Sequence, residues 1–347
     1  MKATWNKLTY KYGYPKVFII IFLALLLAAA VFQKQDIPML LRDSLARVGM
    51  FSILVLALVP SITSGTGLNF ALSIGIICGI LSGCIAIELD LVGITGFLTA
   101  VIITIPLGAM AGYLYSLIIN RVKGDEMTIG TYMGFSVVSL MCIGWLLLPF
   151  KSPEMIWALG GKGLRTTITL NDRFDKILDN FGDIKLLGMN IPVGTFIFFA
   201  LFCLLMWLFL KSKTGAALLA AGDNPKFATA SGINVDKQRT IGTMLSMILG
   251  GIGILVYAQS FGFFQLYQGP LMMPFIAISA ILIGGATSKK ATISNVISGV
   301  VLFQALLTIA LPVINKMTPE GNLSEVIRII VQNGVILYAL TKVGGND

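Results

Sequence analysis

Long apolar runs separated by short polar segments dominate this chain of 347 residues. A helix that crosses the hydrocarbon core of a bilayer needs about 20 mostly apolar residues. Hydrophobic residues make up 56% of the chain and charged residues only 12%. Soluble domains typically contain about 25% charged residues. We therefore predict an all-α polytopic membrane protein, a single transmembrane domain over residues 1–347. Its ten or so transmembrane helices are expected at residues 16–33, 45–63, 68–88, 91–119, 127–150, 192–210, 241–260, 271–287, 293–312 and 325–341.

Residues 211–240 form the longest polar interruption between apolar runs in the C-terminal half. Inside it a short helix is predicted over Pro225–Ser231, with proline at the first helical position, where its missing N–H costs nothing. Asp223 or Asn224 can cap its start, because a short side-chain oxygen reaches the free N–H groups of the first turn. Gly232 can adopt the left-handed conformation that ends a helix. The pattern predicts a rigidly delimited helix presented to a partner, although an ordinary capped loop helix fits it as well.

The distribution of lysine and arginine predicts the orientation. The formal net charge is +9, and the N-terminal segment carries Lys2, Lys7, Lys11 and Lys16 without an acidic residue. Because basic residues concentrate in the cytoplasmic loops of membrane proteins, we place this tail, residues 1–15, in the cytoplasm. Alternating spans then make 151–191 an external loop and 211–240 a cytoplasmic loop. Both termini are expected in the cytoplasm.

The residue types exclude most enzymatic chemistry. The chain has no histidine, which removes histidine acid–base catalysis and most zinc sites. It contains no P-loop pattern, no HExxH pattern and no basic stretch interleaved with aromatic residues. We predict no catalytic residue, no metal site, no cofactor bound by this chain and no nucleic-acid partner. The four cysteines lie within apolar runs and are expected to be buried thiols: Cys78, Cys84, Cys142 and Cys203.

Two further patterns concern packing. In the external loop, Asn171–Phe181 places apolar residues at helical spacing, which predicts an amphipathic helix on the membrane surface, at the external mouth or simply capping the bundle. Glycines recur every four residues in the third and fourth spans, which predicts close backbone contact between helices, with a moving interface as the alternative. These glycines are Gly75, Gly79, Gly83, Gly108 and Gly112.

Polar residues at membrane depth are few, and no pair of ionised residues is expected there. Proton- or sodium-coupled transporters usually need such charges, so the energy for transport is expected to come from outside this chain. Amide and hydroxyl groups along a path suit a neutral, hydroxyl-bearing solute, although they can also simply bridge helices. The candidate path residues are Asn69, Ser73, Gln259, Asn295, Gln304 and Asn333.

The segment LLAAGDNPKFATASGINV, Leu218–Val235, resembles the cytoplasmic loop of ABC-importer permeases of the ribose/galactose (simple sugar) and branched-chain amino-acid superfamily. Residues 246–259, 276–303 and 60–75 resemble other segments of these proteins. Sugar permeases of this type usually place Asp before Leu-Ser in the turn that enters the third span. This chain has Asn69, Phe70 and Ala71 there, which leaves the solute open.

The resemblance implies the partners. Two permease chains, identical or different, form the pore in the lipid of the bacterial cytoplasmic (inner or plasma) membrane. Separate ATPase subunits bind ATP and Mg, and an extracytoplasmic solute-binding protein delivers the solute, with the external loop and Ser260–Pro270 as its expected docking surface. Coupling to the ATPase is implied for Gly222, Asp223, Asn224, Pro225, Ala228, Ser231, Gly232 and Ile233.

Several solutes and mechanisms remain open. A simple sugar is the first expectation, a nucleoside the second and a branched-chain amino acid the third. A stand-alone channel or a secondary transporter would use the same apolar helices, and a membrane enzyme is a more remote alternative.

Overall fold

The computed structural model describes residues 14–156, 164–182, 184–186 and 189–317, together with Val326, Ile330 and Gly334. The predicted tail up to residue 13, most of the predicted span 325–341 and the candidate residue Asn333 lie outside the described residues. The helices are α2 (Tyr14–Phe32), α3 (Ile37–Leu56), α4 (Leu58–Thr63), α5 (Leu72–Glu88), α6 (Gly93–Ile119), α7 (Glu126–Leu147), α8 (Val193–Lys211), α9 (Lys213–Asp223), α10 (Pro225–Ala230), α11 (Val235–Phe261), α12 (Gln268–Ile283) and α13 (Ile293–Met317).

Within the described part, six helical stretches are long and apolar enough to cross a membrane, counting α3 and α4 as one. Three shorter apolar helices, within α2, α5 and α12, add to them. The chain is therefore a multi-pass, mostly helical membrane protein, as the hydrophobic pattern predicts. The tenth predicted span is the one that falls outside the described residues.

The start of α3 differs from the prediction. The helix begins at Ile37 rather than at residue 45, with the Asp36 carboxylate accepting a hydrogen bond from the Met39 N–H at 3.2 Å. Arg42 and Asp43 lie on an exposed face of this helix. The helix can therefore begin before these charged residues, since their side chains face away from the core.

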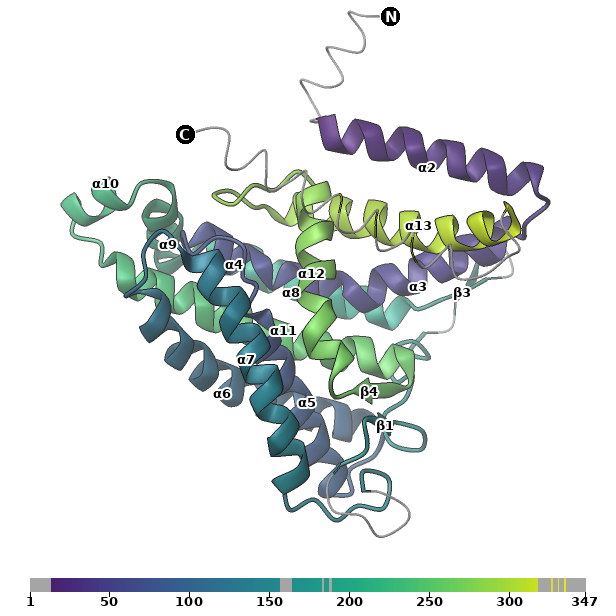
Figure 1. Cartoon of the computed structure of the whole chain (residues 1–347), viewed down its shortest axis with the longest axis horizontal. Coiled ribbons are helices and arrows are strands. Elements are labelled where there is room, and N and C mark those ends of the chain that lie inside the picture. The colour runs from purple at the N-terminus through teal and green to yellow at the C-terminus, as the bar shows by residue number, and fades with distance from the viewer. Residues whose placement is uncertain are drawn as a thin grey trace, which may run out of the picture.

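Helix α11 lies at the centre of the bundle, with α3, α5 and α6 packed along it (Figure 1). The predicted glycine contacts make this packing possible. A β-carbon on Gly79 would be 2.2 Å from the Gly251 carbonyl oxygen, and one on Gly75 would be 2.4 Å from the Met247 carbonyl oxygen. Only glycine allows these helix backbones to approach so closely. A second apolar cluster joins α13 to α2 and α3.

Loops predicted to share a side of the membrane contact one another. On the α10 side, Lys123 forms an ion pair with Asp236, and a β-carbon on Gly285 would be 3.3 Å from Lys16 Cε. On the opposite side, strand β1 (Thr167–Thr169) pairs with β4 (Phe263–Gln265), so the long loop 151–191 is held against the end of α11. A separate hairpin joins β2 (Ile184–Leu186) and β3 (Met189–Ile191). The fold thus separates the two sets of loops as alternating spans require.

The amphipathic helix predicted over Asn171–Phe181 is wrong. These residues form consecutive turns, with left-handed backbone at Asp172 (φ 62°) and Lys176 (φ 50°). The Lys176 N–H donates to the Gln259 carbonyl oxygen at 2.7 Å instead of to a carbonyl of its own segment. Phe174 is nevertheless fully buried, so the apolar spacing is satisfied by turns that pack on the bundle.

Candidate functional site

The segment between α8 and α11 contains two helices where the sequence predicts one. The helix that was not predicted is α9. Ser212 caps its start, and the Ser212 hydroxyl accepts a hydrogen bond from the Gly215 N–H at 3.1 Å. Leu218 and Ala221 are buried on its inner face. Helix α9 was not predicted, because Lys211 and Lys213 precede a short apolar stripe and the whole segment reads as a polar interruption.

Helix α10 is the predicted short helix, and it ends at Ala230, one residue earlier than expected. Of the two candidate caps, Asn224 is the one in use: its side-chain oxygen accepts from the Phe227 N–H at 3.0 Å, whereas Asp223 ends α9. After the helix, Gly232 adopts the left-handed conformation (φ 80°), and the Ile233 N–H donates to the Ala228 carbonyl oxygen at 2.9 Å. Both ends of α10 are therefore fixed by hydrogen bonds, as predicted.

One face of α10 is free of the bundle. The helix lies at an extremity of the molecule, away from the long spans (Figure 1). Ala228 is buried toward the protein, but Phe227 has 67% of its surface exposed, and Lys226 and Thr229 are exposed beside it. A large aromatic side chain displayed on a capped helix is a typical anchor for a protein partner.

The base of this segment rests on the turn that precedes α5. A β-carbon on Gly65 would be 3.1 Å from the Cα of Gly222, and Gly65 has left-handed backbone (φ 82°). Behind the same turn, a β-carbon on Gly242 would be 2.3 Å from the Ser64 hydroxyl oxygen. Ser64 is fully buried. The turn between the predicted spans 45–63 and 68–88 is thus covered by α9 and α11.

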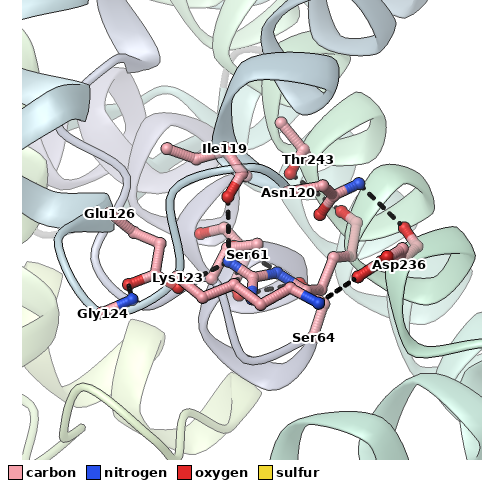
Figure 2. A network of polar contacts seen from close by, with 11 residues as sticks. Ser61, Ser64, Ile119, Asn120, Lys123, Gly124, Glu126, Asp236 and Thr243 are labelled. Atoms are coloured by element: carbon pink, nitrogen blue, oxygen red, sulfur yellow. Dashed lines mark hydrogen bonds and ion pairs between the residues drawn. The ribbon is translucent and has the colours of Figure 1, made fainter.

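A polar network fastens the start of α11 to the α6–α7 turn (Figure 2). Arg239 Nη2 lies 2.6 Å from Glu126 Oε1, and the two side chains are only 7% and 17% exposed. The Asn120 side-chain nitrogen donates to the Asp236 carbonyl oxygen and to the Thr240 hydroxyl, both at 3.1 Å.

The sequence analysis treated Arg239 and Glu126 as loop charges and missed their pairing. One signal was available, since Arg239 continues the buried stripe of α11 through Gly242, Ser246 and Gly250 at helical spacing. An arginine on a buried face requires a partner. Its identity was out of reach, because Glu126 lies more than a hundred residues away in the chain.

Five of the six candidate path residues lie in the described part of the chain. The Asn69 side-chain nitrogen donates to the Ser246 hydroxyl at 2.9 Å, in the buried interior before α5, and Ser73, the second residue of α5, is also buried. Gln304 is buried in α13. Among the five candidates in the described part, no hydrogen bond joins one to another.

Two of the candidates have local structural partners. The Gln259 side-chain oxygen accepts from the Leu178 N–H at 3.1 Å, and its nitrogen lies 2.5 Å from the Ser260 hydroxyl, on the side opposite α10. Asn295, in the first turn of α13, forms a reciprocal cap with Thr292. Its side-chain oxygen accepts from the Thr292 N–H at 3.0 Å, and its own N–H donates to the Thr292 hydroxyl oxygen at 3.2 Å. These hydrogen bonds give the Gln259 and Asn295 side chains structural roles. That the candidate residues line a translocation path stays a prediction.

On the side opposite α10, Arg173 joins the long loop 151–191 to the bundle. Its guanidinium makes two hydrogen bonds to the Glu154 carboxylate, at 2.8 and 3.0 Å, and a third to Asp90 beyond the end of α5. The hydrogen bonds to Glu154 and then to Asp90 raise the pKa of Arg173 above its ordinary value. Arg173 is thus a permanent cation that holds the loop in place.

The fold and this segment define a class: a multi-pass helical membrane protein with a capped helix exposed between two spans. Residues 40–340 match the model of a family described as the permease component of the branched-chain amino acid transport system. The chain belongs to this family of permeases, which confirms the resemblance seen in its sequence. No solved structure matches the chain.

Three similar proteins are named as permeases for different solutes. The nucleoside ABC transporter permease protein NupC of Lactococcus lactis is 27% identical over 214 residues, 58% of this chain and 61% of its own length. The guanosine ABC transporter permease protein NupQ of Bacillus subtilis is 33% identical over 122 residues, 32% of this chain and 38% of its own. The autoinducer 2 import system permease protein LsrD of Photorhabdus temperata is 27% identical over 191 residues, which are 54% of this chain and 51% of its own length. The chain therefore spans less than two thirds of each.

Proposed function

We propose that this chain is the membrane permease subunit of an ATP-binding cassette importer and moves a small polar solute inward. The observation that carries the proposal is α10, a helix fixed at both ends that displays Phe227 away from the bundle. A coupling element has to pass on the closure of an ATPase dimer as a rigid-body movement, and a helix held at both ends does so better than a slack loop. The coupling residues predicted from the sequence, Gly222 to Ile233, run from the end of α9 through α10 to the residues that follow it.

The energy source in this proposal is a partner. ATP and Mg bind to separate ATPase subunits, which dock on α10, and this chain has no enzymatic activity and binds no cofactor. A second permease chain, the same or a different one, completes the pore. The α10 side faces the cytoplasm with both termini, in a bacterial cytoplasmic membrane.

The solute proposed first is a nucleoside, with a simple sugar second. Two of the relatives are named as permeases for a nucleoside and for guanosine, which favours this order over the one expected from the sequence alone. Both solutes are neutral and carry hydroxyl groups, the chemistry that amide and hydroxyl side chains serve. Mass-spectrometric identification of the ligand carried by the cognate binding protein tests this order, and a charged or purely apolar ligand would contradict it.

The test of the importer itself is the ATPase activity of the assembled complex. Permease, ATPase and binding protein are purified together in lipid nanodiscs, and ATP hydrolysis is measured with and without the loaded binding protein. The proposal expects the loaded binding protein to raise the rate. If the ATPase does not associate with the permease, or if its rate ignores the binding protein, the proposal fails.

A further inference from the structure

The buried ion pair between Arg239 and Glu126 joins two helices that otherwise have few contacts. Glu126 is the first residue of α7, and Arg239 lies in the first turns of α11. Elsewhere α7 packs mainly against α5, α12 and α6 rather than against α11. The pair is therefore the strongest polar link between α11 and α7 in the part of the chain that the structure describes.

The pair is better built than the exposed ion pair beside it. Lys123 and Asp236 lie 2.9 Å apart, but their side chains are 57% and 53% exposed, so water and salt screen their attraction. Arg239 and Glu126 are shielded from water, and the second Glu126 oxygen accepts from the Gly124 N–H at 3.0 Å. Removing one partner would leave an uncompensated buried charge, which makes this contact far more sensitive to substitution.

Helix α11 is tied just as closely to α10. Only residues 231–234 separate the two helices, and Asn234 caps α11 by accepting a hydrogen bond from the Lys237 N–H at 2.9 Å. With Gly232 and Ile233 closing α10, this short connection has hydrogen bonds at both ends. A displacement of α10 is therefore passed to the first turns of α11, where Arg239 lies.

Helix α7 is the member of the bundle that such a link can move. Its buried residues are Gly130, Gly134, Val138 and Trp145, and the others are half-buried or exposed. We propose that the Arg239–Glu126 pair carries the displacement of α10 to α7, so that docking of the ATPase shifts α7 against α5 and α12. Arg239 and Glu126 are positioning residues in this scheme, which rests on the proposed importer function.

The experiment compares variants in the complete importer, reconstituted in vesicles with ATPase and binding protein, and measures solute taken up per ATP hydrolysed. Glu126→Gln and Arg239→Lys are expected to lower this ratio roughly tenfold, within the usual range of coupling between sites. The amount of ATPase that copurifies with the permease should stay at the wild-type level. The matched control Lys123→Ala, which removes the exposed pair, should leave the ratio unchanged.

A charge reversal separates coupling from simple destabilisation. Combining Glu126→Arg with Arg239→Glu restores an ion pair of opposite sense and should recover part of the ratio lost in Glu126→Gln. An unchanged ratio in the folded single variants would overturn the inference, and so would a loss of ATPase binding, which would make the pair a docking element. If the wild-type complex shows no ATP-driven uptake, the proposed function itself fails.

Discussion

Gly222, in the last turn of α9, lies against Thr63, the last residue of α4: a β-carbon on Gly222 would be 2.2 Å from the Thr63 carbonyl oxygen. The segment that carries α10 is thus fitted backbone to backbone onto the buried turn that leads into α5. This contact gives the exposed helix a firm base, because backbone atoms cannot rearrange as a flexible side chain can.

Gly222→Val is expected to destabilise the protein, since the new side chain meets backbone atoms of Thr63 and Gly65. Overpacking of this kind costs about 1–3 kcal/mol. A lower thermal unfolding midpoint of the detergent-solubilised permease measures the effect. Ala216→Val, at an exposed position of the same helix, is the control and should leave the midpoint unchanged. Equal unfolding midpoints for the two variants would show that the Gly222 contact does not contribute to the stability of the fold.

Gly232→Val should uncouple transport, because the left-handed backbone at this position costs about 1–2 kcal/mol for a non-glycine residue and more for a β-branched one. Asn224→Pro, which removes the cap of α10, should act in the same way. We expect ATP-driven uptake to fall while membrane insertion stays normal. Gly232→Asn is the control, since asparagine tolerates the left-handed conformation. Normal uptake in both Gly232→Val and Asn224→Pro would remove the coupling role from α10.

Phe227→Ala should weaken binding of the ATPase without changing the stability of the permease alone, because Phe227 is 67% exposed. Burying a side chain of this size is worth about 1.5–3 kcal/mol, or roughly a tenfold to hundredfold change in affinity. Titration of the ATPase onto the permease in nanodiscs measures it. Phe181→Ala removes an equally exposed phenylalanine (66%) on the opposite side and serves as the control. ATPase affinity that is equal in wild type and Phe227→Ala would place the docking surface elsewhere.

Gly79→Ala should disrupt the central helix pair, since its β-carbon would collide with the backbone of α11 at Gly251. The expected result is a lower yield of folded protein and a lower unfolding midpoint. Gly144→Ala in α7 is the control, because its nearest neighbour is the Met141 sulfur at 2.8 Å, part of a flexible side chain. If Gly79→Ala is as stable as Gly144→Ala, the α5–α11 approach is looser than the packing indicates.

The sequence predicts the membrane spans well because each span depends on its own residues. The runs that form α6 and α8 have to satisfy every backbone group within one helix, whatever their neighbours do. The short helix α10 was also predictable, since Asn224, Pro225 and Gly232 act through local backbone geometry.

The parts that depend on distant partners were not predictable. The turns around Lys176 follow from hydrogen bonds to Gln259, more than eighty residues further along the chain. The Arg239–Glu126 pair likewise needs the fold to bring the starts of two helices, α11 and α7, together. Helical spacing in the long loop 151–191 does not reveal the Gln259 contact, and the position of Arg239 on a buried stripe indicates a partner without identifying it.

Solute uptake by sealed vesicles tests the central claim most directly. Vesicles are prepared with the permease alone, with permease and ATPase, and with a catalytically inactive ATPase, and loaded binding protein is added to each outside. We predict accumulation of the solute only with the active ATPase and internal ATP. Uptake at the same rate by the permease alone, without ATPase or ATP, would contradict this account and identify the chain as a channel or a secondary transporter.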